Sequence, residues 1–392
     1  MALPDLLERE STNQVVFDGN SFGKKVILNR PHKSNALTHQ MISEMENRLE
    51  DYENDPQVKL VILKGNGKAF CAGGDNVAIY KFLTAVDNKS GDWSFGASYF
   101  NKLFALQYLV STYKKPLVAI LDGVVMGGGA AVSMLANFKI VTENTMQVFA
   151  VPEGALGSSI GDSYSLSRLP GYFGEYLGLT GAQIDGAEMI ECGLATHFVF
   201  SKDLQPLENA LDKVDSSDTS AISQLIGKFM HKPNIKQHSA YNRLPTVNKC
   251  FSRETVEDIL LALKEEMGNG DDEKWIIDSI NSMKSSSPLS LKVSLKLLRE
   301  SRRHNLEESM ILDYTVFCRI LLRTVSNDVY EGMRAKFIEK GAKPKWQPSK
   351  LELVTKEMVD RCFNKLVNEK NLEFLKSPSR SKLVDNIVSS KL

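Results

Sequence analysis

The first 200 residues repeat one pattern, in which a short apolar run is followed by a turn of small residues and then by a segment that can be helical. Apolar runs of this length are typical of buried strands, and they fall at residues 25–29, 59–65, 117–121 and 138–142. Repeated strand–turn–helix units can wind into a doubly wound sheet or into a spiral of stacked turns. The pattern alone does not choose between these two α/β arrangements.

The clearest helix is predicted for residues 38–54, with Thr38 as its N-cap. Apolar side chains recur there at spacings of three and four, as a helix packed on one face requires: Met41, Met45, Leu49 and Tyr52. Residues 182–193 predict a shorter helix that ends at Gly193, because glycine favours the helix C-cap.

After residue 199 the glycine-rich rhythm stops, and the polar residues 216–220 mark a boundary. Leucine, isoleucine and methionine then recur at helical spacing in residues 256–267, 289–301 and 306–322. We therefore predict a core at residues 10–215, a helical region at residues 221–375 packed beside it, and a polar tail at residues 376–392.

Two turns almost without side-chain bulk occur about fifty residues apart, at residues 69–75 (Ala-Phe-Cys-Ala-Gly-Gly-Asp) and 125–130 (Val-Met-Gly-Gly-Gly-Ala). Each follows an apolar run and precedes a segment that can be helical. Such turns present free backbone N–H groups, which can stabilise an oxygen that gains negative charge. Either turn alone is a weak signal, but the pair in this order is a strong one.

Composition narrows the function classes. Lys+Arg and Asp+Glu both number 48, so nothing suggests a broad nucleic-acid or membrane surface. The longest uncharged stretch, residues 123–138, is shorter than the roughly 20 apolar residues that cross a bilayer. The five cysteines are widely spread without a CxxC pair, and the six histidines have no metal-ligand spacing. A disulfide framework and a metal site are therefore disfavoured.

Two residues are alternative candidates for a catalytic nucleophile, Cys71 and Ser159. Cys71 lies inside the first turn, but no nearby histidine motif marks it for activation, and a small residue that fills the turn is the better interpretation. Ser159 is central in a Gly-x-Ser-x-Gly pattern, which is typical of a nucleophile elbow and would need His197 and a later acid. The pattern is short, and we interpret His197 as a hydrogen-bonded histidine that begins a strand.

Several segments together resemble the crotonase (enoyl-CoA hydratase/isomerase) superfamily: residues 29–37, 68–75 and 123–129. Others resemble its 3-hydroxyisobutyryl-CoA hydrolase branch, especially the plant members: residues 149–157, 166–171, 193–199, 248–256, 287–292, 331–338 and 343–346. The resemblance runs from about Val15 to Phe363, and it implies the crotonase-type spiral with a helical C-terminal region.

The resemblance implies roles for individual residues. The backbone N–H groups of Cys71 and Gly128 correspond to the family's oxyanion donors, and Glu153 corresponds to its catalytic glutamate. The remaining residues that we expect to contact the acyl-CoA substrate are Ala72, Gly73, Gly74, Asp75, Lys33 (toward a CoA phosphate) and Asp162. No metal or redox cofactor is implied.

Three departures from the family pattern bear on activity. The second glutamate of the hydratases is replaced by Ala131, which disfavours hydration of enoyl-CoA. The family's Phe-Pro-Asp-Val-Gly reads Gly-Ser-Ser-Ile-Gly at residues 157–161, so its aspartate is missing and Asp162 is a poor substitute unless the loop shifts. A glutamate pair of the family is replaced by Lys102 and Leu103.

We therefore expect hydrolysis of a short, branched 3-hydroxyacyl-CoA thioester, as in valine breakdown. The alternative is a degenerate member of the family that binds acyl-CoA or a protein partner without turnover. The acidic N-terminal segment is unlike a mitochondrial transit peptide. The terminal Ser-Lys-Leu, residues 390–392, predicts recognition by the peroxisomal import receptor and a peroxisomal location. The oligomeric state is open and includes a homo-oligomer.

Overall fold

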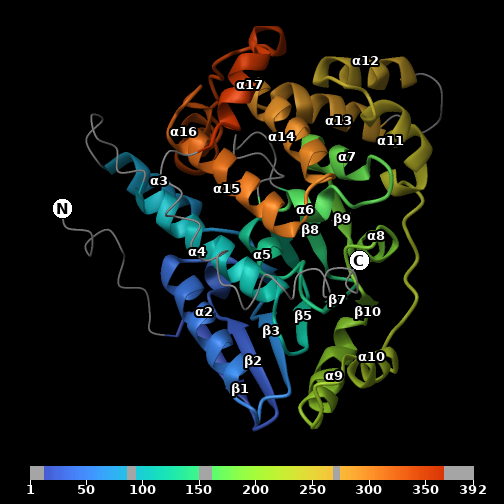
Figure 1. Ribbon diagram of the computed structural model, residues 1–392. Coiled ribbons are helices and arrows are strands. Elements are labelled where there is room, and N and C mark those ends of the chain that lie inside the picture. Colours follow the sequence, from blue (N-terminus) through green and yellow to red (C-terminus); the bar gives the residue numbers. More distant parts are fainter. Residues whose placement is uncertain (1–12, 86–93, 150–160, 268–273, 366–392) are drawn as a thin grey trace.

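The computed structural model describes residues 13–85, 94–149, 161–267 and 274–365, and its elements form two sheets with helices around them (Figure 1). The larger sheet has the strand order β1-β2-β3-β5-β7-β10 and is parallel except for β1. Its strands are β1 (Val15–Gly19), β2 (Gly23–Leu28), β3 (Leu60–Gly65), β5 (Leu117–Leu121), β7 (Phe138–Val141) and β10 (His197–Phe198).

The second sheet has the order β4-β6-β8-β9, with β9 antiparallel to its neighbour. Its strands are β4 (Ala69–Cys71), β6 (Val124–Met126), β8 (Met146–Val148) and β9 (Gln183–Asp185). Three successive units, β3 with β4, β5 with β6 and β7 with β8, each give one strand to each sheet. This repeat forms the spiral that the resemblance implied, and it does not form a doubly wound sheet.

Both faces of the larger sheet are buried, because its strands alternate side chains between two apolar layers. One face, with Ile62, Ile120 and Ile140, packs against α9 (Leu204–Leu211) and α10 (Thr219–Gly227). The opposite face joins the main core inside the spiral, together with α2 (His39–Asn54).

The helix expected at residues 38–54 is confirmed. Met41, Met45, Leu49 and Tyr52 are buried, and the Thr38 hydroxyl accepts a hydrogen bond from the Met41 N–H at 3.1 Å. The helix expected at residues 182–193 is only partly correct, because residues 183–185 form β9 and pair with β8. Helix α8 (Gly186–Glu191) begins after it, at a capping box formed by Asp185 and Glu188.

The remaining helices of the first half are α3 (Asn76–Ala85), α4 (Ser94–Ser111), α5 (Gly128–Ala131), α6 (Ser163–Leu166) and α7 (Phe173–Thr180). Of these helices, α5 packs against β4 and β6 of the second sheet, and the others pack mainly against helices. Helix α4 is buried on most of its surface, and it was not predicted from the sequence.

After β10 every described element is helical, as the sequence predicted. The helices after α10 gather at the end of the molecule opposite α9 and α10 (Figure 1). They are α11 (Leu244–Phe251), α12 (Val256–Glu266), α13 (Lys274–Ser285), α14 (Pro288–Ser301), α15 (Leu306–Leu321), α16 (Asp328–Met333) and α17 (Lys356–Cys362). One cluster of buried side chains extends from Val15 to Met333, so the helical region shares the main core. Across the described residues, no helix has both the length and the apolar character of a membrane span.

Candidate active site

The two glycine turns converge on a pocket of about 110 Å³. Helix α4 supplies one wall, and helix α15 closes the pocket with Phe317, whose ring centroid lies 3.8 Å from that of Phe100. The described lining consists of Ala72, Gly73, Gly74, Asn76, Tyr99, Phe100, Leu103, Phe104, Gln107, Met126, Gly127, Gly128, Ala131, Gly161, Asp162 and Phe317. Most of this surface is apolar and suits an acyl chain.

The glycines are needed because the two turns touch one another. A β-carbon on Gly129 would lie 2.6 Å from the β-carbon and the carbonyl oxygen of Cys71, which leaves no room for it. A β-carbon on Gly74 would lie 2.7 Å from the Tyr99 hydroxyl oxygen, and that hydroxyl donates to the Leu37 carbonyl at 3.0 Å. The backbone of both turns is therefore exposed directly to the pocket.

Two amide N–H groups at this junction have no hydrogen-bond acceptor among the described residues, those of Gly74 and Gly128. Leu37 bridges the first turn through Gly73 and Asp75, so the intervening Gly74 N–H points away from Leu37. Gly128 is the first residue of α5, where N–H groups lack a partner within the helix. A β-carbon on Gly73 would lie 3.7 Å from the Gly128 nitrogen, which shows how close the turns come.

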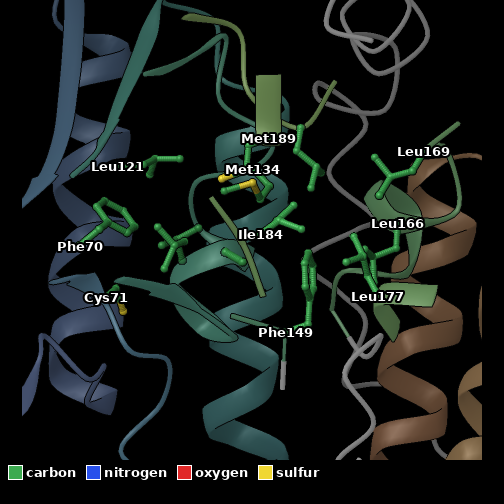
Figure 2. Close-up of a cluster of buried hydrophobic side chains, with 14 of the residues drawn as sticks. Phe70, Cys71, Leu121, Met134, Phe149, Leu166, Leu169, Leu177, Ile184 and Met189 are labelled. Atoms are coloured by element: carbon green, nitrogen blue, oxygen red, sulfur yellow. The ribbon is translucent and has the colours of Figure 1, made fainter. Parts of the chain in front are cut away.

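The structure does not place Cys71 as the resemblance implied. Cys71 is the last residue of β4, pairs with Val125 of β6, and is absent from the pocket lining. Figure 2 draws its side chain among buried hydrophobic side chains, and its thiol donates to the Asn35 carbonyl at 3.1 Å. Burial raises the pKa of the Cys71 thiol to about 12, so a thiolate nucleophile is disfavoured.

Asp75 and Lys33 also lie outside the pocket lining, contrary to the contact expected for Asp75. The Asp75 carboxylate accepts from the buried Arg30 guanidinium at 3.2 Å and from the Ala78 N–H at 3.1 Å, so it holds the start of α3. Lys33 is exposed at the end of a short 3-10 helix, Pro31–Lys33, which is tied to the first turn because the Ala72 N–H donates to the carbonyl of the next residue, Ser34, at 2.9 Å. A role for Lys33 toward a CoA phosphate stays a prediction.

Asp162 reaches the pocket even though it follows the altered segment. Its side chain is 8% exposed and has no hydrogen bond among the described residues, and burial raises its pKa to about 7. The backbone just before it is held from two sides. The Gly161 N–H donates to Asp313 Oδ2 of α15 at 3.1 Å, and Gln107 Nε2 of α4 donates to the Gly161 carbonyl at 2.6 Å.

Asp313 and Gln107 were not identified from the sequence. Asp313 is 1% exposed, and its pKa is raised by burial and by the neighbouring Asp162, although hydrogen bonds from Ser163 and Gly161 oppose this. Its Oδ1 has no hydrogen-bond partner in the described part of the chain. Two acids this deeply buried disfavour a state in which both are ionised.

Of the positions 102, 103 and 131, where the resemblance implies further acids, two are apolar here. Ala131 and Leu103 both line the pocket, whereas Lys102 lies outside the lining and pairs with Glu46 at 3.7 Å. The pocket therefore lacks the second glutamate that hydration of enoyl-CoA requires at position 131.

Glu153 and Ser159 lie outside the described residues. His197 begins β10, as expected, with its ring Nδ1 2.8 Å from the Thr196 hydroxyl, and it does not line the pocket. Among the described residues, no group of three or more His, Cys, Asp or Glu side chains is arranged to hold a metal ion.

Comparison with known proteins agrees with this geometry. The family model described as enoyl-CoA hydratase/isomerase matches residues 24–363. The chain is 45% identical to 3-hydroxyisobutyryl-CoA hydrolase 1 of Arabidopsis thaliana over 96% of this chain and 97% of that protein. It is also 45% identical to a probable 3-hydroxyisobutyryl-CoA hydrolase 2 of the same plant, over 97% and 100%.

Among solved structures, a carnitinyl-CoA dehydratase from Mycobacterium thermoresistibile superimposes with a TM-score of 0.81 at 29% identity, covering 91% of this chain and 98% of that one. A match of this coverage includes most of the spiral and most of the C-terminal helices. The chain belongs to the enoyl-CoA hydratase/isomerase family and, within it, to the 3-hydroxyisobutyryl-CoA hydrolase branch.

Proposed function

We propose that this protein hydrolyses the thioester of 3-hydroxyisobutyryl-CoA to 3-hydroxyisobutyrate and CoA. The observation that carries this proposal is the position of the Gly74 and Gly128 N–H groups, which have no acceptor in the described part of the chain, at the junction of two glycine turns beside an apolar pocket. The relatives named as 3-hydroxyisobutyryl-CoA hydrolases, similar over nearly the whole chain, support the same reaction class.

Thioester hydrolysis places negative charge on the carbonyl oxygen when water or a carboxylate adds to the carbonyl carbon. Donors fixed in advance at that oxygen lower the barrier, and one such donor is worth a factor of ~100 to ~1000 in rate. We assign the two oxyanion donors to the N–H groups of Gly74 and Gly128. Gly74 replaces Cys71 in this role, because Cys71 pairs with Val125 in the second sheet and is absent from the pocket lining.

Glu153 is the proposed base that activates water, or the nucleophile that forms a transient anhydride. Either role returns the free acid and releases CoA as a thiol. The assignment of Glu153 rests on the resemblance of residues 149–157 to the family motif. The apolar Ala131 in the pocket argues against the two-glutamate hydration of an enoyl-CoA.

A member of the family without catalytic activity is the disfavoured alternative. Binding a protein partner would not require two amides that lack an acceptor among the described residues beside a small apolar pocket. We further propose a role in valine catabolism and a peroxisomal location, on the basis of the substrate and of the terminal Ser-Lys-Leu. A homo-oligomer stays a prediction.

The test is CoA release by the purified full-length protein from a panel of thioesters: 3-hydroxyisobutyryl-CoA, 3-hydroxypropionyl-CoA, isobutyryl-CoA and acetyl-CoA. We expect the two hydroxylated esters to give the highest kcat/KM. Hydration of crotonyl-CoA is measured in the same preparation. Efficient hydration without thioester hydrolysis would overturn the proposal.

A further inference from the structure

Asp162 and Gln107 are two polar side chains in the mostly apolar lining of the pocket. Both side chains are buried, with exposures of 8% and 4%, and both line the pocket. The Asp162 carboxyl has no hydrogen bond among the described residues, although a buried polar group normally has a partner. A buried carboxyl that lines a mostly apolar pocket and has no partner among the described residues is placed to bond a polar group of the ligand.

Hydrogen bonds to the residues on both sides of Asp162 fix its position. Gly161, the residue before it, has φ +90°, in the left-handed region, and its N–H and carbonyl are held by Asp313 and Gln107. Ser163, the residue after it, bonds Asp313 and accepts from the Ser301 hydroxyl at 2.9 Å. Elements from α4, α14 and α15 thus converge on one short segment whose only free polar side chain, among the described residues, faces the pocket.

Resting on the proposed function, we propose that Asp162 and Gln107 form a subsite for a hydroxyl group on the acyl chain, and that Asp313 is a positioning residue for Asp162. A hydroxyl can donate to the Asp162 carboxyl. The Gln107 amide uses its Nε2 on Gly161, so its carbonyl oxygen is an alternative acceptor for the same O–H.

The proposal predicts discrimination between two esters that differ only in that hydroxyl. A site built to bond a hydroxyl rejects the analogue without it by a large factor, because its polar groups are left unpaired. We expect wild-type kcat/KM for 3-hydroxyisobutyryl-CoA to exceed that for isobutyryl-CoA by a factor of ~100 or more. Asp162→Ala should lower that ratio at least ~10-fold, and Asp162→Asn, which keeps an acceptor oxygen, should retain much of it.

Asp313 is tested by the same ratio. Asp313→Ala removes the acceptor of the Gly161 N–H and should lower the ratio as Asp162→Ala does, whereas Asp313→Asn keeps an acceptor oxygen and should preserve it. Asp328→Ala is the matched control, because Asp328 is also a buried acid that accepts from a backbone N–H, that of Gln347, but lies outside the pocket lining. It should leave the ratio unchanged even where it lowers stability.

The outcomes separate this inference from the proposed function. Equal wild-type rates on the two esters, or a ratio that survives Asp162→Ala, would overturn the subsite while thioester hydrolysis stands. If no thioester is hydrolysed, the proposed function fails, and the Kd values of the two esters are compared by calorimetry. A tighter Kd for the hydroxylated ester that Asp162→Ala abolishes supports the subsite, and equal Kd values overturn it.

Discussion

Replacing Asp162 with asparagine should change how the stability of this protein depends on pH. Asp162 is 8% exposed without a hydrogen-bond partner among the described residues, and burial raises its pKa from the ordinary 3.8 to about 7. The folded protein therefore keeps this proton up to about pH 7, whereas the unfolded chain loses it near pH 4. Between those values the folded state binds more protons than the unfolded state, so the free energy of unfolding falls as pH rises.

The magnitude follows from the size of the shift. About three pH units at 1.4 kcal/mol each give at most about 4 kcal/mol, of which about 3 kcal/mol is lost between pH 5 and pH 8. The asparagine side chain carries no charge at any of these pH values, so the Asp162→Asn variant should lack this part of the pH dependence. At about pH 8 it should be more stable than wild type by up to about 4 kcal/mol. Asp313 is retained in both proteins, and loss of the neighbouring Asp162 charge eases its ionisation, which acts in the same direction.

Urea unfolding followed by tryptophan fluorescence, at about pH 5 and about pH 8, measures this difference. Asp215→Asn serves as the control, because Asp215 is an exposed aspartate, and it should leave the pH dependence as in wild type. Parallel pH profiles for wild type and Asp162→Asn would refute the reasoning, since they would mean that burial imposes no cost on the Asp162 charge.

Three further predictions concern the turns, the altered segment and the C-terminus. Gly129→Ala places a β-carbon 2.6 Å from Cys71, so it should lower the free energy of unfolding by about 1–3 kcal/mol and reduce CoA release. Gly227→Ala is the control, because Gly227 has open space around it and its substitution should change neither quantity. Equal urea midpoints for the two variants would contradict this. Grafting Phe-Pro-Asp-Val in place of residues 158–160 should raise the rate on 3-hydroxyisobutyryl-CoA, and a scaffold inactive before and after would favour the non-catalytic alternative. Deleting Leu392 should move a fluorescently tagged protein (tagged at its N-terminus) from peroxisomes to cytosol, and import that survives would make the tripeptide incidental.

The sequence pattern predicted those elements whose structure depends on neighbouring residues in the chain. Helix α2 follows from its apolar spacing and the Thr38 cap, and the two turns follow from their lack of side chains. Helix α4 escaped prediction because it is apolar on most sides, which weakens the periodic signal of an amphipathic helix. Residues 183–185 look helical in sequence, but pairing with β8 overrides that tendency.

The site was predictable only in part, because half of it is assembled from distant segments. Gly128 and Gly74 lie in motifs that can be read directly, although the oxyanion role was first placed on Cys71, which strand pairing holds away from the pocket. The contact between Gly161 and Asp313 joins residues 152 positions apart, and no local signal marks Asp313 within an ordinary helix. The sequence alone does not mark Asp162 as a site residue, because its candidate role follows from its burial and from the hydrogen bonds that hold the backbone of Gly161 beside it.

The central claim is that this protein hydrolyses 3-hydroxyisobutyryl-CoA with Glu153 as its base or nucleophile. The most direct test is CoA release from that ester by purified wild-type protein, measured beside Glu153→Gln, which keeps the shape of the side chain and removes its acid–base function. We predict release by wild type and a fall of ~100-fold or more in the variant, with binding of the CoA ester little changed. Release that is unaffected by Glu153→Gln, or the absence of release by wild type, would contradict the account.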